Sequence, residues 1–316
     1  MSKAISQRSR RTYFNNPLIE ESLRYLPDAL AHTTSVAFRA HLVRVLPQSS
    51  VQTRQRFAEY ISQRFSHDGR MNLELAAALA KFGDSRGGRE ILYFELLRAS
   101  PVLQEIASLW LAEQPAEGTT RKSLLAFLER RLGGRNADQV ATAAIATFRR
   151  CRKITSPKPA VYVPVWAEPP LEAFLYVLAR LYPERAMVRV DQLTAQPNVR
   201  ALLWPRPALA PLLEEARLAG HVSKISELDQ YHQFTLAEPA NERMSRLLGY
   251  PPIPPPGTLV AREPTATYGK STGNPKAAAP MRQPKPMPKK PPKKSASKRR
   301  HAGGKAKQLS LLARDE

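Results

Sequence analysis

The sequence has a single cysteine, Cys151, and no long apolar run. One cysteine in 316 residues excludes an internal disulfide framework, and the six scattered histidines do not have zinc-ligand spacing. No stretch of about 18 apolar residues is present, and the start lacks the apolar core of a signal peptide. We therefore expect a soluble, cytoplasmic protein with no membrane span. Cys151 follows Val140, Ala144 and Phe148 at helical spacing, which predicts a buried thiol and not a nucleophile.

The motifs of common enzymes are also lacking. The chain has no glycine-rich phosphate loop, no nucleophile elbow and no metal-binding helix motif. Gly87-Gly88 and Gly133-Gly134 are typical of helix boundaries. Neighbouring glutamates such as Glu214-Glu215 point about 100° apart on a helix, so their carboxylates do not face a common acid/base site. We expect no catalysis, no cofactor and no metal.

Positive charge is what the chain has in excess. It holds 49 Lys/Arg and 27 Asp/Glu, a net charge of +22. Such an excess indicates a polyanionic partner, either nucleic acid or an anionic membrane surface. Residues 251–316 carry fifteen Lys/Arg against three Asp/Glu, so +12 lies there and +10 in the first 250 residues.

The C-terminal segment, residues 241–316, is predicted to be a disordered Lys/Pro-rich tail. It has Ala and Gly between its lysines and no apolar period, so it cannot bury enough surface to offset the entropy of ordering. Its basic cluster can neutralise phosphates by releasing counterions, without reading any sequence. A tail that only keeps the protein soluble is the alternative. The cluster comprises Lys289, Lys290, Lys293, Lys294, Lys298, Arg299 and Arg300.

The apolar spacing predicts a mainly α protein whose residues 16–155 form an all-helical domain. A basic arm (1–15) precedes it and is best interpreted as a mobile terminus. Asn16 and Pro17 are predicted to cap and open the first helix, and Ser100-Pro101 to separate two later ones. Helical spacing covers, in chain order, Ile19–Leu26, Val36–Leu46, Phe57–Phe65, Leu73–Phe82, Ile91–Leu96, Leu103–Trp110, Leu124–Leu132 and Val140–Cys151.

After a Pro-rich linker (156–170), residues 171–240 have the pattern of an α+β winged helix. The predicted order is a helix from Leu171 to Leu181, a strand from Met187 to Leu193, and a short helix from Arg200 to Trp204. A second helix from Leu209 to Gly220 and the hairpin strands Val222–Ile225 and Tyr231–Leu236 complete it. A winged helix usually places one helix in the DNA major groove while the wing contacts phosphate. Here Glu214 and Glu215 offset Arg206 and Arg217, which weakens sequence-specific reading. Packing against a partner protein is the alternative use of this module.

Candidate phosphate contacts come from both predicted domains. Arginines surround one helix that begins near Ser50, and a second group crowds the end of the last helix of the helical domain. Favourable interaction with the helix dipole explains the second group equally well. The winged module adds four more. These candidates are Arg54, Arg56, Arg64, Arg149, Arg150, Arg152, Lys153, Arg200, Arg206, Lys224 and His232.

A short apolar segment ends the tail. Gln308, Leu309, Ser310, Leu311 and Leu312 resemble the pentapeptide with which bacterial proteins bind the sliding clamp of the replisome. On a flexible basic tether such an anchor could reach a ring that encircles DNA. A random apolar terminus is the alternative, because five-residue matches arise easily by chance. The sliding clamp is therefore a speculative partner, held by Gln308, Leu309, Leu311 and Leu312.

Two short polar signatures and the overall layout resemble a known family. The opening Asn15-Asn16-Pro17-Leu18-Ile19-Glu20-Glu21-Ser22, the Ser49–Arg56 run with Thr53-Arg54, and a helical domain followed by a winged module are similar to the BrxA family of accessory proteins in bacterial BREX phage-defence systems. The resemblance covers roughly residues 15–240. It implies a helical domain like the NusB antitermination fold, and double-stranded DNA binding without catalysis. The family pattern would have glycine near Asn15 and Asn16, and the tail is an addition to it.

The leading hypothesis is a non-enzymatic, double-stranded DNA-binding accessory protein of a BREX system, acting with other BREX proteins. Two alternatives remain open. The winged module could contact partner proteins, which would make the chain a protein-interaction adaptor. The NusB-like resemblance also permits RNA binding, although we find no exposed aromatic platform for stacking unpaired bases.

Overall fold

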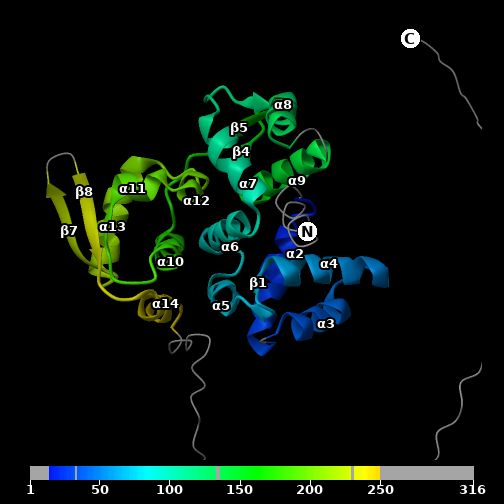
Figure 1. The fold of residues 1–316 in the computed structure, drawn as a ribbon, viewed down its shortest axis with the longest axis horizontal. Helices are drawn as coiled ribbons and strands as arrows, with labels where there is room; N and C mark the ends of the chain where they lie inside the picture. The colour runs from blue at the N-terminus through cyan, green and yellow to red at the C-terminus, as the bar shows by residue number, and fades with distance from the viewer. Residues whose placement is uncertain (1–13, 33, 133–135, 229–230, 250–316) are drawn as a thin grey trace, which may run out of the picture. The chain divides into compact units, whose positions relative to one another are not determined.

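The computed structural model describes residues 14–249, apart from 33, 133–135 and 229–230 (Figure 1). The described part is mainly helical, with small antiparallel sheets. The spacing of apolar residues predicted a mainly α protein, and this prediction is confirmed. Its helices are α2 (Ile19–Tyr25), η1 (Leu26–Ala31), α3 (Ser35–Val45), α4 (Val51–Arg64), α5 (Leu73–Phe82), α6 (Arg86–Ala99), α7 (Pro101–Glu105), η2 (Ile106–Trp110), η3 (Leu111–Glu113), α8 (Arg121–Leu132), α9 (Ala137–Arg150), α10 (Leu171–Leu181), α11 (Val190–Ala195), α12 (Pro197–Arg200), η4 (Arg206–Ala208), α13 (Leu209–Leu218) and α14 (Ala240–Leu248).

Local capping sets many of these helix starts. Thr34, Ser50, Asn72 and Ser85 each accept a hydrogen bond from the backbone N–H three residues later, at the starts of α3, α4, α5 and α6. Ser100 ends α6 and caps α7, and Pro101 occupies the first position of α7. The predicted punctuation at Ser100-Pro101 is therefore confirmed.

The first helix begins later than predicted. Asn16 and Pro17 lie before α2, and Leu18, with φ 49°, occupies the N-cap position instead. The backbone there is held by Arg64 of α4, which donates to the carbonyls of Asn15, Asn16 and Pro17. The local Asn-Pro signal was wrong as a cap because a side chain 47 residues away fixes the turn.

Three small sheets occur in the described residues, two of them where the sequence predicted only helices and a linker. β1 (Ser66–His67) pairs with β2 (Arg70–Met71), and β5 (Val161–Pro164) pairs with both β3 (Thr119–Thr120) and β4 (Ile154–Thr155). Strands of two to four residues leave too little alternation to detect in a sequence. The predicted linker 156–170 thus contains β5, which joins strands on either side of α8 and α9.

The C-terminal half confirms most of the predicted order and corrects several boundaries. β6 (Met187–Arg189) is shorter than predicted, because Val190 and Leu193 are on α11. The next helix, α12, ends at Arg200, where the sequence predicted a helix to start. β6, β8 (Tyr231–Leu236) and β7 (Val222–Leu228) form an antiparallel sheet in the order β6-β8-β7. Residues 241–248, predicted to belong to the tail, form most of α14 (Ala240–Leu248), which packs on α10.

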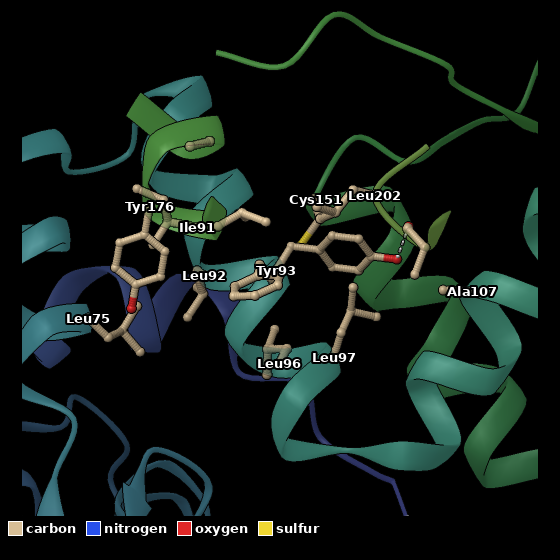
Figure 2. Close-up of a cluster of buried hydrophobic side chains, with 14 of the residues drawn as sticks. Leu75, Ile91, Leu92, Tyr93, Leu96, Leu97, Ala107, Cys151, Tyr176 and Leu202 are labelled. Atoms are coloured by element: carbon tan, nitrogen blue, oxygen red, sulfur yellow. Dashed lines mark hydrogen bonds between the residues drawn. The ribbon is translucent and has the colours of Figure 1, made fainter. Parts of the chain in front are cut away.

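Helix α6 is the centre of the described structure. It contacts α5 and α2 of the first half and α10 and α12 of the second, as Figure 1 shows. Every residue from Glu90 to Leu97 on α6 is buried. Figure 2 shows Tyr93 of this helix reaching between Cys151 and Leu202, and its hydroxyl donates to the carbonyl of Ala201 at 3.3 Å.

The single cysteine is buried, as the helical spacing predicted. Burial raises the pKa of the Cys151 thiol to about 12, which supports the prediction that it is not a nucleophile.

A buried polar network joins the two halves beside this apolar cluster. The Lys153 ammonium lies 2.5 Å from Glu90 Oε1 and donates to the Leu202 carbonyl at 2.7 Å. Trp204 Nε1 donates to the same Glu90 oxygen at 2.6 Å. Glu90 and Lys153 are only 7% and 4% exposed. A second network has Glu95 of α6 accepting from Tyr176 and Arg180 of α10, at 3.0 Å each.

The first turn of α6 makes a close approach that permits only glycine. A Cβ at Gly88 would overlap the Gly83 carbonyl oxygen, whereas one at Gly87 would meet only the flexible Glu172 side chain. We expect Gly88→Ala to lower the free energy of unfolding by about 1–3 kcal/mol, because backbone must move. Gly87→Ala is the matched control with a smaller effect. Urea unfolding midpoints of the two variants check this, and equal midpoints would contradict it.

Candidate nucleic-acid interface

The end of α9 and the loop between β4 and β5 carry four exposed cations. Arg149, Arg150 and Arg152 are exposed, and so is Lys158 in the loop. We call these four residues the α9 cluster. Among the residues that the structure describes, none of the four is in an ion pair. No Asp or Glu occurs between Asp138 and Glu168, so these cations also have no acidic neighbour in the sequence.

Arg152 adopts an uncommon backbone conformation. It has φ 57°, in the left-handed region. Its N–H donates to the Arg149 carbonyl at 3.0 Å, and the Lys153 N–H donates to the Phe148 carbonyl at 2.7 Å. This is the Schellman arrangement, in which the left-handed residue is usually glycine. A residue other than glycine costs about 1 kcal/mol or more there, so Arg152 carries its charge at a strained backbone position.

The neighbours of Arg149 hold its guanidinium in one place. It lies 5.3 Å from the Tyr162 ring centroid and donates to Ser156 Oγ at 3.2 Å. The Arg150 carbonyl accepts from Arg89 at 3.1 Å, which anchors the last turn of α9 to α6. A planar guanidinium that is already positioned by such contacts loses little entropy when it binds a phosphate. The site therefore offers preorganised positive charge at one end of a rigid helix.

Lys153, predicted with this group, is not part of the surface. It is buried and paired with Glu90. Because Lys153 is only 4% exposed, its ammonium is not accessible to a phosphate on the surface. The left-handed turn at Arg152 is the reason, because it directs the next residue inward.

The three arginines predicted on α4 differ in exposure. Arg56 is exposed. Arg54 donates to the carbonyls of Val43, Gln48 and Ser49 and so fixes the turn between α3 and α4. Arg64 holds the segment before α2, and burial lowers its pKa to about 10. Arg54 and Arg64 therefore have structural partners, and α4 presents only Arg56 among the predicted contacts.

The four candidates in the C-terminal half differ in their surroundings. Arg200 pairs with Glu113 at 2.9 Å. Lys224 is exposed on β7, while Arg206 and His232 line a groove beside α13. The candidates at Lys289, Lys290, Lys293, Lys294, Lys298, Arg299 and Arg300, and the pentapeptide at 308–312, lie outside the described residues.

Charge is divided unequally between the two halves. Residues 14–155 contain twenty Lys/Arg and fourteen Asp/Glu, whereas residues 156–250 contain ten of each. The second half is therefore neutral overall. On α13, Arg217 is paired with Glu214 at 2.8 Å. Net attraction to a polyanion therefore comes from residues 14–155, from residues 1–13, which contain four Lys/Arg and no Asp or Glu, and from residues 251–316.

Sequence reasoning missed Lys158 and several exposed residues of α8. Lys158 lies between Pro157 and Pro159, and Lys122, Arg130 and Arg131 are exposed on α8. The signal that could have found Lys158 is the acid-free run from residue 139 to 167, which isolates five basic residues. No group of metal-ligating side chains occurs in the part of the chain that the structure describes. In that same part, no helix is both long and apolar enough to cross a bilayer.

Comparisons with known proteins concern the fold alone. No family model matches the chain, and no curated protein matches it. Two solved structures do, and they are titled "SspB crystal structure" and "Magnesium ion-bound SspB crystal structure". Their TM-scores are 0.52 and 0.50 at 12% and 11% identity, and each match covers 76% of this chain and 86% of the other.

Proposed function

We propose that this chain is a non-enzymatic accessory protein that binds double-stranded DNA mainly through phosphate contacts, in a bacterial BREX phage-defence system. The observation that carries the DNA proposal is the α9 cluster, in which four exposed cations have no carboxylate partner among the described residues. Cations in such a group release counterions from a duplex without reading its sequence. The BREX assignment rests on the BrxA resemblance of residues 15–240.

The finer fold assignments belong to the same proposal. The order α10, β6, α11, α12, α13, β7, β8 and the strand order β6-β8-β7 support a winged helix for residues 171–236. A NusB-like fold for residues 16–155 rests on the BrxA resemblance and is compatible with a mainly helical half. Because residues 156–250 are neutral overall, we assign most phosphate contacts to residues 14–155, to Lys158 and to the tail.

A second candidate function is a protein-interaction adaptor. The neutral charge of residues 156–250 favours it, because protein interfaces need no net attraction to phosphate. The two functions are compatible if each half has its own partner. An RNA-binding role is the third candidate, and competition between equal lengths of duplex DNA and RNA distinguishes it.

We expect residues 1–258 without the rest of the tail to retard a 30-base-pair duplex at low salt. Removal of the tail should reduce the slope of log affinity against log salt by about one for each phosphate that the tail neutralises. Gel retardation and fluorescence anisotropy at several salt concentrations measure both quantities. If the shortened chain fails to retard duplex at low salt while its unfolding midpoint is normal, the folded part has no DNA role and the adaptor function replaces it.

A further inference from the structure

A groove of about 660 Å³ lies between α13 and the β7–β8 hairpin. Its apolar lining comes from three elements, Val190 of α11, Leu213 of α13 and Ile225 of β7. Pro207 and Pro211 add rigid walls, because proline has a fixed φ angle. The size lies within the range of about 300–1,000 Å³ that is common for binding pockets.

The polar residues of the groove lie mainly on exposed positions. Arg206, Glu214 and His232 are exposed, and Gln233 is half-buried. The carboxylate of Glu214 is already bound by Arg217 at 2.8 Å. Arg206 takes part in no ion pair within the described residues. The groove therefore combines an apolar interior with a cation that can receive a carboxylate.

We propose that this groove binds a segment of a partner protein in which a large apolar side chain is flanked by acidic residues. The apolar side chain would lie against Val190, Leu213 and Ile225, and an adjacent carboxylate would bind Arg206. This occupant follows from charge complementarity, since the free charge at the rim is positive. The neutral charge of the module disfavours a nucleic-acid strand as the occupant. The basic part of this chain's own tail is disfavoured by repulsion from Arg206.

The test uses the full chain and a random 12-residue peptide library displayed on phage. Selection on the natural chain is followed by removal of every phage that also binds Ala210→Trp, whose indole fills the groove from an exposed position. This step discards peptides that bind the basic tail, which both chains share. We expect the survivors to carry an acidic residue next to an aromatic or aliphatic one.

Two further substitutions separate the groove from the rest of α13. A labelled surviving peptide should bind at least tenfold more weakly to Arg206→Glu, because the charge at the rim is reversed. It should bind normally to Leu218→Trp, since Leu218 is 80% exposed on the same helix and does not line the groove. Unfolding midpoints confirm that the variants fold.

Three results would overturn the inference. The first is that no peptide survives the removal step, and the second is that survivors lack acidic residues. The third is that Arg206→Glu leaves binding of the surviving peptide intact but weakens binding of duplex DNA or RNA, which would make the groove a nucleic-acid contact. A failure of this inference can be distinguished from a failure of the proposed DNA function. The DNA function is tested with residues 1–258 and duplex DNA, whereas the groove is tested with the full chain and a peptide.

Discussion

Replacing Lys153 with methionine is expected to lower the free energy of unfolding by about 3–5 kcal/mol, because it leaves the Glu90 carboxylate buried without its cation. The Leu202 carbonyl is also left without its donor. Only the Trp204 N–H would still bind Glu90. Urea unfolding, followed through tryptophan fluorescence, measures the change.

An exposed ion pair provides the control for this prediction. Arg200 and Glu113 lie 2.9 Å apart with side chains 42% and 56% exposed, so Arg200→Met should cost at most about 1 kcal/mol. The double variant Lys153→Met with Glu90→Gln should recover much of the stability, since a neutral amide oxygen can still accept from Trp204. A destabilisation by Lys153→Met no larger than that by Arg200→Met would show that the buried network does not hold the halves together.

The sequence predicted helix boundaries that depend on residues within one turn. It did not predict burial or pairing that depends on residues far away in the sequence. Ser100-Pro101 was predicted as a helix boundary because capping depends on residues within one turn. Lys153 was wrongly predicted to be an exposed phosphate contact. The sequence alone does not distinguish it from the three neighbouring arginines, Arg149, Arg150 and Arg152. Only the left-handed turn and Glu90, 63 residues earlier, distinguish the buried member.

Short elements were missed for a related reason. Val190 and Leu193 fit either a strand or a helix, and a run of this length cannot decide between them. In α14, Met244, Leu247 and Leu248 have helical spacing and are buried. That spacing lies at the start of a segment whose proline and lysine content predicts a tail. The packing of α14 on α10 could not be foreseen from composition.

Removing three charges of the α9 cluster is expected to weaken duplex binding strongly without destabilising the fold. The variant combines Arg150→Gln, Arg152→Gly and Lys158→Gln, all at exposed positions. Glycine at position 152 relieves the left-handed backbone, so the unfolding midpoint should stay the same or rise. If each side chain binds one phosphate, the salt slope of residues 1–258 should fall by about three. Anisotropy titrations from about 50 to 300 mM salt measure the slope.

The matched control removes the same charge elsewhere. Arg39 and Arg44 of α3 and Arg70 of β2 are exposed, and their replacement by glutamine changes net charge equally. A larger slope change for the α9 variant would show that the cluster contacts the duplex directly, because general attraction depends only on total charge at long range. Equal changes in both variants would mean that no specific surface on the helical half contacts phosphate. The arginine at the left-handed position would then have no explanation in DNA binding.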